Sequence, residues 1–280
     1  MMELYNKTSF NISKLVTKTY STSFSLGIAA FSPHYRDAIY GIYGFVRLAD
    51  EIVDTFHNYD QKRLIENFRR ETEEALRTGI STNPILQAFV TTVNEYKIDY
   101  HYVDAFLKSM EMDLSNSYYE PEEYNEYIYG SAEVVGLMCL KVFCGHDKEL
   151  FNQLISPARS LGSAFQKVNF LRDIKSDMEE RERIYLPGIN HAQKIDDVSK
   201  KNLERDIEKE FKDAFEGIKK LPYGVKLGVY SAYLYYLALF RKIKRMKVKD
   251  LMKGRVRVSN PAKLALLFRG LVEVRLLKVT

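Results

Sequence analysis

Two pairs of aspartates are the residues of this chain best suited to chemistry. Asp50 and Asp54 form one Asp-x-x-x-Asp pair, and Asp173 and Asp177 form the second. In a helix, residues four apart are neighbours on one face, so each pair would present two carboxylates to a common point. Carboxylate oxygens are hard ligands that suit Mg²⁺, and Mg²⁺ usually completes its octahedron with substrate phosphates. The pairs therefore predict metal-assisted chemistry on a diphosphate.

The first pair has a cation and an aromatic hydroxyl in register with it. Tyr43, Arg47, Asp50 and Asp54 follow one another at spacings of four, three and four, which places them on one helix face. The planar guanidinium of Arg47 can bind phosphate oxygens through two parallel hydrogen bonds. The alternative is an ordinary Arg–Asp ion pair on a solvated helix, which is common and contributes little to stability.

The second pair continues a stripe of two amides. Gln166, Asn169, Asp173 and Asp177 repeat at spacings of three, four and four, and large apolar residues such as Phe165 surround them. A polar stripe framed by apolar residues is typical of an interior wall, whereas a solvated face would carry more Lys and Glu. Either motif alone would be weak, but together they favour a diphosphate site over a solvated surface.

Helices must position these residues, because apolar residues recur at helical spacing and alternation with a period of two never persists. We predict an all-α fold with helices at about residues 8–20, 35–57, 60–78, 84–95, 100–116, 121–144, 148–181, 199–217, 222–248 and 260–277. Five prolines lie near expected helix starts, where a missing N–H costs little: Pro33, Pro84, Pro121, Pro222 and Pro261. One longer irregular stretch is expected at 182–198. No linker or repeat divides the chain, so residues 1–280 are predicted to form one domain.

The composition indicates a globular chain of 280 residues, 46% hydrophobic, with a net charge of +5 that does not argue for nucleic acid binding. Met1–Ser9 lacks the features of a signal peptide, and the longest apolar stretch, Tyr230–Phe240, is shorter than the roughly 20 residues that span a bilayer. Cys139 and Cys144 have no neighbours at zinc-ligand spacing and suit buried thiols in a reducing compartment. We therefore expect a cytoplasmic protein.

The positive charge concentrates in residues 241–257, which hold nine Lys or Arg and one acid, Asp250. Such a run is usually a solvated face. Contact with an anionic membrane surface is the alternative, and it would place the protein peripherally at the inner face of the membrane.

Five segments of the chain resemble the squalene and phytoene synthases in order and spacing. They are residues 20–24 (YSTSF), 38–54 (AIYGIYGFVRLADEIVD), 127–136 (YIYGSAEVVG), 164–177 (AFQKVNFLRDIKSD) and 183–187 (RIYLP). The resemblance extends over most of the chain and is closest to bacterial phytoene synthases. It implies the class I isoprenoid synthase fold, a single helical bundle around a central cavity.

The resemblance also assigns roles to individual residues. It implies several Mg²⁺ ions bound by Asp50, Asp54, Asp173 and Asp177 together with Asn169. Arg47 is similar to the arginine that binds diphosphate, and Ser21 and Ser23 to hydroxyls that close the phosphate pocket. The family pattern places further residues in the cavity, of which Tyr43 and Tyr127 would have catalytic roles: Tyr43, Tyr127, Gln166, Asn169 and Tyr235.

Three residues depart from the pattern of many relatives. Glu51 replaces a third aspartate of the first cluster, Tyr20 stands where some relatives have His, and Glu133 stands where Gly is usual. Glu51 keeps the charge on a longer arm, and Glu133 is expected to face a polar partner or the rim of the site. No diphosphate contact is carried over to Tyr20.

The implied reaction is the head-to-head condensation of two prenyl diphosphates through a cyclopropyl intermediate, in a cavity that excludes water. Condensation of two C20 geranylgeranyl diphosphates gives phytoene without a reductant, whereas squalene from two C15 farnesyl diphosphates needs NADPH. The small side chains at four positions near the first pocket favour C20 substrates: Ile28, Ala29, Ala30 and Gly41. Phytoene synthase is therefore the leading hypothesis.

Other functions stay open. The runner-up is a squalene or dehydrosqualene synthase. A silent assembly factor of the same fold is disfavoured because both aspartate pairs are retained. A terpene cyclase or chain-elongating prenyl transferase would use the same metal chemistry but fits the spacing less well.

Overall fold

Helices make up almost the whole of the computed structural model, which describes residues 1–179, 183–185 and 196–275. They are α1 (Met2–Tyr20), α2 (Thr22–Ala29), α3 (Pro33–Asp54), α4 (Gln61–Thr78), α5 (Pro84–Tyr96), α6 (Tyr100–Ser115), α7 (Pro121–Ile128), α8 (Val134–Cys144), α9 (Lys148–Glu179), α10 (Asp197–Lys220), α11 (Tyr223–Lys244), α12 (Val248–Leu251) and α13 (Asn260–Arg275). Apart from an isolated bridge between Tyr118 and Ile184, the described residues form no β-structure. The prediction of an all-α fold is confirmed.

Local sequence signals explain most helix boundaries. Proline is the first residue of α3, α5 and α7, as expected. Asp60 and Asn83 cap α4 and α5 by accepting hydrogen bonds from backbone N–H groups of the first turn. Gly79 ends α4 in the left-handed conformation, at φ 77°.

Three elements differ from the prediction. Helix α2 was not expected, because its eight residues are too few to give a clear apolar period. The expected helix 121–144 contains a π-helical turn at Tyr129–Glu133. The expected helix 222–248 ends at Lys244, and α12 follows after a short turn. Most of the irregular stretch predicted at 182–198 lies outside the described residues.

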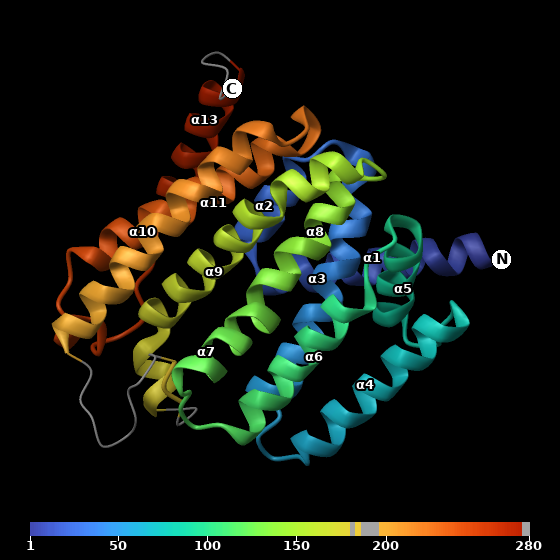
Figure 1. Ribbon diagram of the computed structural model, residues 1–280. Helices are drawn as coiled ribbons and strands as arrows, with labels where there is room; N and C mark the ends of the chain where they lie inside the picture. Colours follow the sequence, from blue (N-terminus) through green and yellow to red (C-terminus); the bar gives the residue numbers. More distant parts are fainter. Residues whose placement is uncertain (180–182, 186–195, 276–280) are drawn as a thin grey trace.

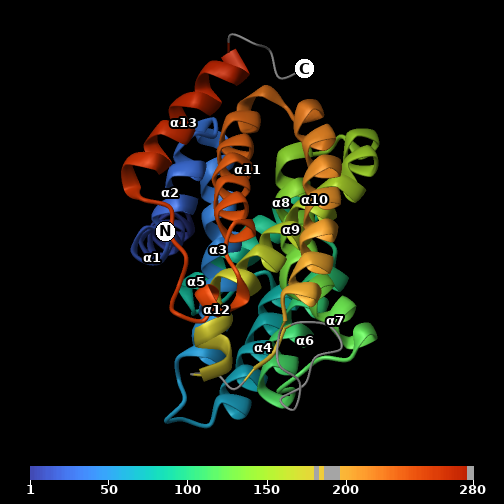
Figure 2. The ribbon, with the colours of Figure 1, turned by 90° about the vertical axis from the view of Figure 1, so that its left-hand side faces the viewer.

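The two helices that carry the acidic motifs, α3 and α9, are linked through three other helices, α8, α2 and α11 (Figures 1 and 2). Helix α8 packs against both of them on one side, while α2 and α11 connect them on the other, α2 contacting α3 and α11 contacting α9. Gly228 of α11 allows close approach to α2, since a Cβ there would lie 2.4 Å from the Gly27 carbonyl oxygen. These five helices therefore enclose the interior of the bundle between α3 and α9.

Helix α3 is held in place by aromatic packing on the side away from this interior. The ring of Phe45 is fully buried and stacks on Phe89 of α5 with centroids 3.9 Å apart. Phe106 of α6 packs against the same ring at 5.3 Å. Because Phe45 and Arg47 are about 200° apart around the helix, burial of Phe45 turns Arg47 toward the interior.

Among the residues that the structure describes, one helix is long and apolar enough to cross a membrane by length and composition alone. It is Pro121–Cys144, with a mean hydropathy of 1.4, and half of its most apolar window is buried within the described fold. It does not coincide with Tyr230–Phe240, the longest apolar stretch of the sequence if Ser231 is tolerated. The contacts of its α8 half with α3, α6 and α9 are those of a core helix.

The main hydrophobic core extends from Ile28 in α2 to Val274 in α13. A smaller cluster of aromatic residues lies where α7 meets the end of α9, and includes Tyr127 and Phe170. The second acidic motif therefore lies on a helix that both clusters hold in place.

Candidate active site

Arg47 is the cation at the centre of the α3 face. Its guanidinium lies over the ring of Tyr20, 4.4 Å from the centroid, and forms an ion pair with Glu51 one turn along the helix. Its Nε–H group is buried and has no acceptor among the described residues. An orphaned buried donor on a cation suits an anionic ligand. The contacts also account for two residues that depart from the family pattern, since Tyr20 and Glu51 both hold Arg47.

Tyr43 connects this face to α2. Its ring lies 5.5 Å from that of Phe24, and its hydroxyl interacts with the side chain of Ser21. Burial raises the pKa of Tyr43 to about 12; Arg47 opposes the shift, and the nearby Tyr236 adds to it. Tyr43 is therefore a neutral donor at physiological pH, as a group beside a diphosphate would need to be.

The two serines assigned to the phosphate pocket both lie at the start of α2. Ser21 caps the helix by accepting a hydrogen bond from the backbone N–H of Phe24 at 3.2 Å. Ser23 is half-buried in the first turn, and its hydroxyl makes no hydrogen bond with a described residue. Because the N-terminus of a helix carries partial positive charge, this position suits a phosphate group.

The amides of α9 form a chain of hydrogen bonds that begins on α11. The hydroxyl of Tyr236 donates to Asn169 Oδ1 at 3.2 Å, and Asn169 Nδ2 donates to Gln166 Oε1 at 3.3 Å. Gln166 Nε2 in turn donates to the Ser131 hydroxyl at 3.5 Å. The ring of Tyr236 stacks on Phe165, with centroids 3.8 Å apart. The structure thus brings together the amide stripe predicted from sequence.

The tyrosine that contacts these amides is Tyr236, whereas the family pattern indicated its neighbour Tyr235. Tyr235 is only half-buried, its ring meets that of Tyr236 edge-on at 5.3 Å, and the Lys263 ammonium lies 5.5 Å from its centroid. Adjacent helical residues point about 100° apart, so which of the two tyrosines faces α9 depends on how α11 packs against α9.

Asp173 carries two arginine partners. Arg172 contacts both carboxylate oxygens, with Nε 3.0 Å from Oδ1, and Arg255 Nε lies 2.9 Å from Oδ1. Arg255 belongs to the basic segment 241–257, which was expected to lie on the surface. The chain after α12 folds back far enough to bring this residue to the second acidic motif.

Asp54 also has an arginine partner, since Arg183 Nη1 lies 3.0 Å from its Oδ1. Asp50 is half-buried, and Asp177 is 8% exposed. The charge of Asp50 raises the pKa of Tyr43, which places the carboxylate near that hydroxyl. Both acidic motifs therefore lie at the partly buried ends of α3 and α9.

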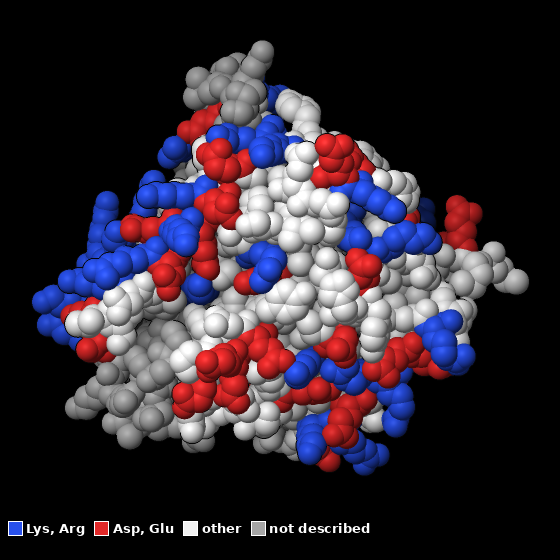
Figure 3. All heavy atoms as spheres, viewed as in Figure 1, with Lys and Arg blue, Asp and Glu red and all other residues white. Residues whose placement is uncertain are grey.

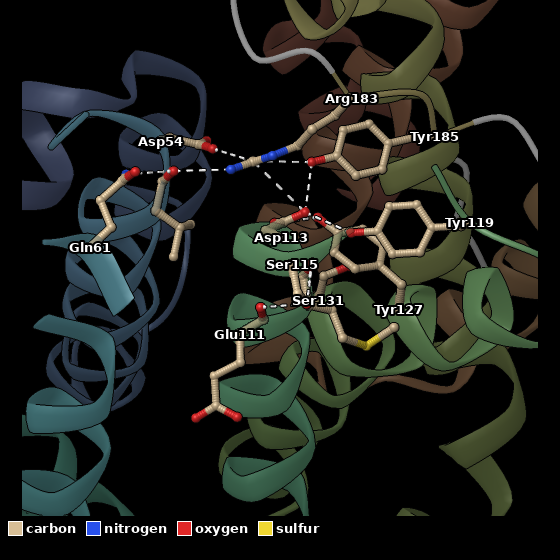
Figure 4. A network of polar contacts seen from close by, with 12 residues as sticks. Asp54, Gln61, Glu111, Asp113, Ser115, Tyr119, Tyr127, Ser131, Arg183 and Tyr185 are labelled. Carbon is tan, nitrogen blue, oxygen red and sulfur yellow. Dashed lines mark hydrogen bonds and ion pairs between the residues drawn. The ribbon is translucent and has the colours of Figure 1, made fainter. Parts of the chain in front are cut away.

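Tyr127 occupies a different position from the one expected. It was predicted to face the cavity with its hydroxyl near the diphosphate, but this hydroxyl donates to Asp113 Oδ2 at 2.9 Å within the smaller aromatic cluster. Figure 4 shows Tyr127 and Asp113 together with Arg183. Asp113 was not identified from sequence, although it follows Phe106 and Met110 at spacings of seven and three and so lies on the apolar face of an amphipathic helix.

The small residues used to predict substrate length also differ from expectation. Gly41 faces α5, because a Cβ there would lie 2.9 Å from the Ala88 carbonyl oxygen. Ala29 is exposed, and its carbonyl accepts a hydrogen bond from Arg36. Ile28 is buried, and Ala30 is half-buried. These positions therefore give no support for C20 over C15 substrates.

Glu133 faces a polar partner, as expected. Its Oε2 lies 2.6 Å from Nε of Arg159 on α9. Glu133 is the last residue of the π-helical turn, and it contributes a contact between that turn and α9.

The donor set fits Mg²⁺ as pairs of ligands. Among the described residues no three or more His, Cys, Asp or Glu side chains form a group that could hold a metal ion by themselves. Each acidic motif supplies hard carboxylate oxygens, and Asn169 adds an amide oxygen beside the second. Mg²⁺ is usually held by one or two carboxylates plus substrate phosphates, which is the arrangement that such pairs permit. The arginines beside them would neutralise the remaining phosphate charge.

Comparison with known proteins relates this chain to one family. The Squalene/phytoene synthase model matches residues 17–262. Phytoene synthase from Arthrospira platensis is 28% identical over 261 residues, covering 85% of this chain and 84% of the relative. Phytoene synthase 1 from Solanum lycopersicum is 28% identical over 247 residues, covering 81% of this chain, which spans only 58% of that longer protein.

Solved structures show the same fold. A crystal structure of a dehydrosqualene synthase with a bound ligand has a TM-score of 0.81 at 22% identity, covering 96% of this chain and 98% of the other. A squalene synthase from Alicyclobacillus acidocaldarius has a TM-score of 0.74 at 20% identity, covering 86% and 95%. The fold is thus the all-helical terpenoid synthase fold, and the chain belongs to the squalene/phytoene synthase family of prenyltransferases.

Proposed function

We propose that this protein is a Mg²⁺-dependent phytoene synthase of carotenoid biosynthesis, which condenses two geranylgeranyl diphosphates head to head and releases diphosphate. The observation that carries the proposal is the buried Nε–H of Arg47, which has no acceptor among the described residues and lies on the same face of α3 as Asp50 and Asp54. Bound Mg²⁺ would stabilise the charge of the departing diphosphate. The similarity to named phytoene synthases favours the C20 substrate.

The residues on α3 and those on α9 and α11 would have different roles in the reaction. The buried Nε–H of Arg47 and the neutral hydroxyl of Tyr43 would bind and orient the first diphosphate. The hydrogen-bonded amides of α9 would fix the second substrate, and Phe165 with Tyr236 would cover the cation that forms with aromatic faces. The stacked rings also exclude water, which would quench that cation.

The product is tested by incubating the purified protein with Mg²⁺ and either geranylgeranyl or farnesyl diphosphate, then extracting the hydrocarbon for mass spectrometry. A C40 product from the first substrate without NADPH supports the proposal. A C30 product and no C40 product would instead identify a squalene or dehydrosqualene synthase, which the presence or absence of an NADPH requirement then distinguishes. No hydrocarbon from either substrate contradicts both.

The metal ligands are tested by conservative substitutions on the two faces. Asp50→Asn and Asp173→Asn should each abolish turnover, because an amide keeps the size of the side chain and removes the charge that binds Mg²⁺. Asp37→Asn is the matched control, since Asp37 lies on the same helix as Asp50 but is exposed. Circular dichroism should report equal helix content in all three variants. Unchanged turnover in Asp50→Asn contradicts the assignment.

We also propose that the protein contacts a membrane at its periphery, where its substrate and product reside. The nine basic residues of 241–257 are all exposed, and Arg241, Arg245 and Lys249 pair with no acid among the described residues. Figure 3 shows Lys and Arg gathered at the left edge of that view, where α10 and the chain after α11 lie in Figure 1. Leu264 and Phe268 of α13 add exposed apolar side chains at 58% and 67% exposure.

Vesicle sedimentation tests this contact. A triple substitution of Arg241, Arg245 and Lys249 to Gln should weaken binding to vesicles that contain anionic lipid, because about 1 kcal/mol is lost per basic residue near the surface. Binding to neutral vesicles should change little. Equal binding of both proteins to anionic vesicles contradicts the role of these side chains.

A further inference from the structure

A buried carboxylate lies outside the site described above and ties three tyrosines together. Asp113, near the end of α6, is 6% exposed. Its Oδ1 accepts hydrogen bonds from the hydroxyls of Tyr119 at 2.9 Å and Tyr185 at 2.7 Å, and its Oδ2 accepts one from Tyr127 at 2.9 Å. Figure 4 shows the three rings around this carboxylate. Because all three hydroxyls donate to the Asp113 carboxylate, they are engaged within the protein and are not placed to bind substrate.

Arg183 connects this carboxylate to the first acidic motif. Its Nη1 lies 3.8 Å from Asp113 Oδ1 and 3.0 Å from Asp54 Oδ1, and its Nη2 donates to the Val53 carbonyl at 3.1 Å. The guanidinium therefore lies between two carboxylates, as Figure 4 shows. It contacts the last turn of α3 through both a side chain and a backbone oxygen.

The same residue also contacts the second acidic motif. The backbone N–H of Arg183 donates to the Asp177 carbonyl at 2.8 Å. The next residue, Ile184, is anchored on the end of α6, where its N–H donates to the Ser117 carbonyl at 2.9 Å. Arg183 is thus the described residue through which the ends of α3, α6 and α9 are joined.

The energetics make these contacts interdependent. Arg183 is 6% exposed, and a buried guanidinium is costly unless negative charge and acceptors surround it. Asp113 supplies that charge, and the three tyrosine hydroxyls satisfy the oxygens of Asp113. Loss of the Asp113 charge would leave Asp54 as the remaining carboxylate beside the cation and loosen Arg183 from α6.

We propose that Asp113 and Arg183 are positioning residues that fix the Asp54 carboxylate and hold the two acidic motifs at the separation required for divalent cations and diphosphate. The role of the motifs in this inference rests on the proposed function. Groups that orient metal ligands typically affect metal affinity by about 10- to 100-fold when they are removed. Asp113 touches no metal ligand directly, so the lower end of that range is expected.

The test measures binding of Mn²⁺ by electron paramagnetic resonance in the presence of inorganic pyrophosphate, which requires no turnover. Asp113→Asn keeps the shape of the side chain and one acceptor oxygen for the tyrosine hydroxyls, while it removes the charge and replaces the other oxygen with an amide donor. We expect the apparent dissociation constant of Mn²⁺ to rise about tenfold. Tyr124→Phe is the matched control, because Tyr124 belongs to the same aromatic cluster and its buried hydroxyl has no partner among the described residues. It should leave the constant unchanged.

Arg183→Met and the double variant with Asp113→Asn decide whether the carboxylate acts through the guanidinium. If it does, Arg183→Met weakens Mn²⁺ binding and the double variant is no weaker than Arg183→Met alone. In the alternative case, Arg183 occupies the position beside Asp54 that a metal ion would take when bound. Removal of Arg183 would then tighten Mn²⁺ binding, and this result would overturn the proposal. Unchanged binding in Asp113→Asn would also overturn it.

A milder variant guards against loss of the fold. Tyr185→Phe removes the hydrogen bond to Asp113 and the one that the Tyr185 hydroxyl accepts from Arg183 Nη1 at 3.3 Å, and it keeps the ring that stacks on Phe170. Its Mn²⁺ constant should rise about two- to fivefold at temperatures where thermal scans show the protein folded. Because the assay uses pyrophosphate, failure to form hydrocarbon would contradict the proposed function without affecting this result.

Discussion

The clearest prediction about the site concerns the adjacent tyrosines of α11. Tyr236→Phe removes the hydroxyl that donates to Asn169 Oδ1 at 3.2 Å. The ring keeps its stack on Phe165, with centroids 3.8 Å apart, so packing of α11 against α9 is preserved. The substitution therefore removes the hydroxyl that begins the chain of hydrogen bonds through Gln166, together with its interaction with Arg172.

The expected loss of activity follows from the free energy that such a hydrogen bond contributes. A hydrogen bond between neutral groups contributes about 0.5–1.5 kcal/mol, and loss of this amount in the transition state lowers kcat/KM roughly 2- to 10-fold. The loss should appear in kcat/KM and leave thermal stability nearly unchanged. Without its donor, Asn169 can rotate away from the orientation in which its oxygen faces the second acidic motif.

Tyr235→Phe is the paired control. The hydroxyl of Tyr235 makes no hydrogen bond with a described residue, and its ring contacts would be retained. We expect less than a twofold change in kcat/KM for hydrocarbon formation, measured with radiolabelled prenyl diphosphate. A larger loss in Tyr235→Phe than in Tyr236→Phe would refute the assignment of Tyr236 to the site.

Three further predictions concern packing, thiols and backbone. Gly228→Ala should lower the free energy of unfolding by about 1–3 kcal/mol in urea titrations, because its Cβ would lie 2.4 Å from the Gly27 carbonyl oxygen. Gly27→Ala is the control and should leave the free energy of unfolding nearly unchanged, because the nearest atom to its Cβ would be 3.6 Å away. Burial raises the pKa of Cys144 to about 11 and that of Cys139 to about 12, so at pH 8 the thiolate is rarer than in free cysteine by about two orders of magnitude or more. Alkylation by iodoacetamide, followed by mass spectrometry, should accelerate about tenfold per pH unit from pH 8 to 10, and reaction of folded protein at the rate of free cysteine would contradict this. Lys97→Gly should stabilise the protein by about 0.5–1 kcal/mol in thermal scans, since Lys97 has a φ of 52°, and a lower melting temperature would contradict this strain.

Local spacing was sufficient to predict the acidic motifs and their helices. Asp50 and Asp54 lie within α3, and Asp173 and Asp177 within α9, because an i, i+4 relation depends only on helix geometry. The amide stripe could be predicted for the same reason. Helix α2 was missed because a short helix capped by a serine gives little periodic signal.

Contacts between distant segments could not be predicted in this way. Small size at Gly41 suggested open space, whereas the glycine allows α5 to pack closely. Arg255 is exposed, as its run of positive charge indicated, but nothing in the sequence indicated that the turn after α12 brings it to Asp173. Asp113 became meaningful only when Arg183, seventy positions later, was placed beside it.

The π-helical turn at Tyr129–Glu133 affects how this region can be compared with relatives. In a regular helix, residues seven apart lie on nearly the same face. A π-helical turn accommodates one additional residue and rotates the downstream helix by about 100° relative to the upstream helix. Tyr127 of α7 and Val134 of α8 therefore face different neighbours. A residue equivalence carried across this turn by counting positions, from a relative without it, would assign side chains to the wrong helix face.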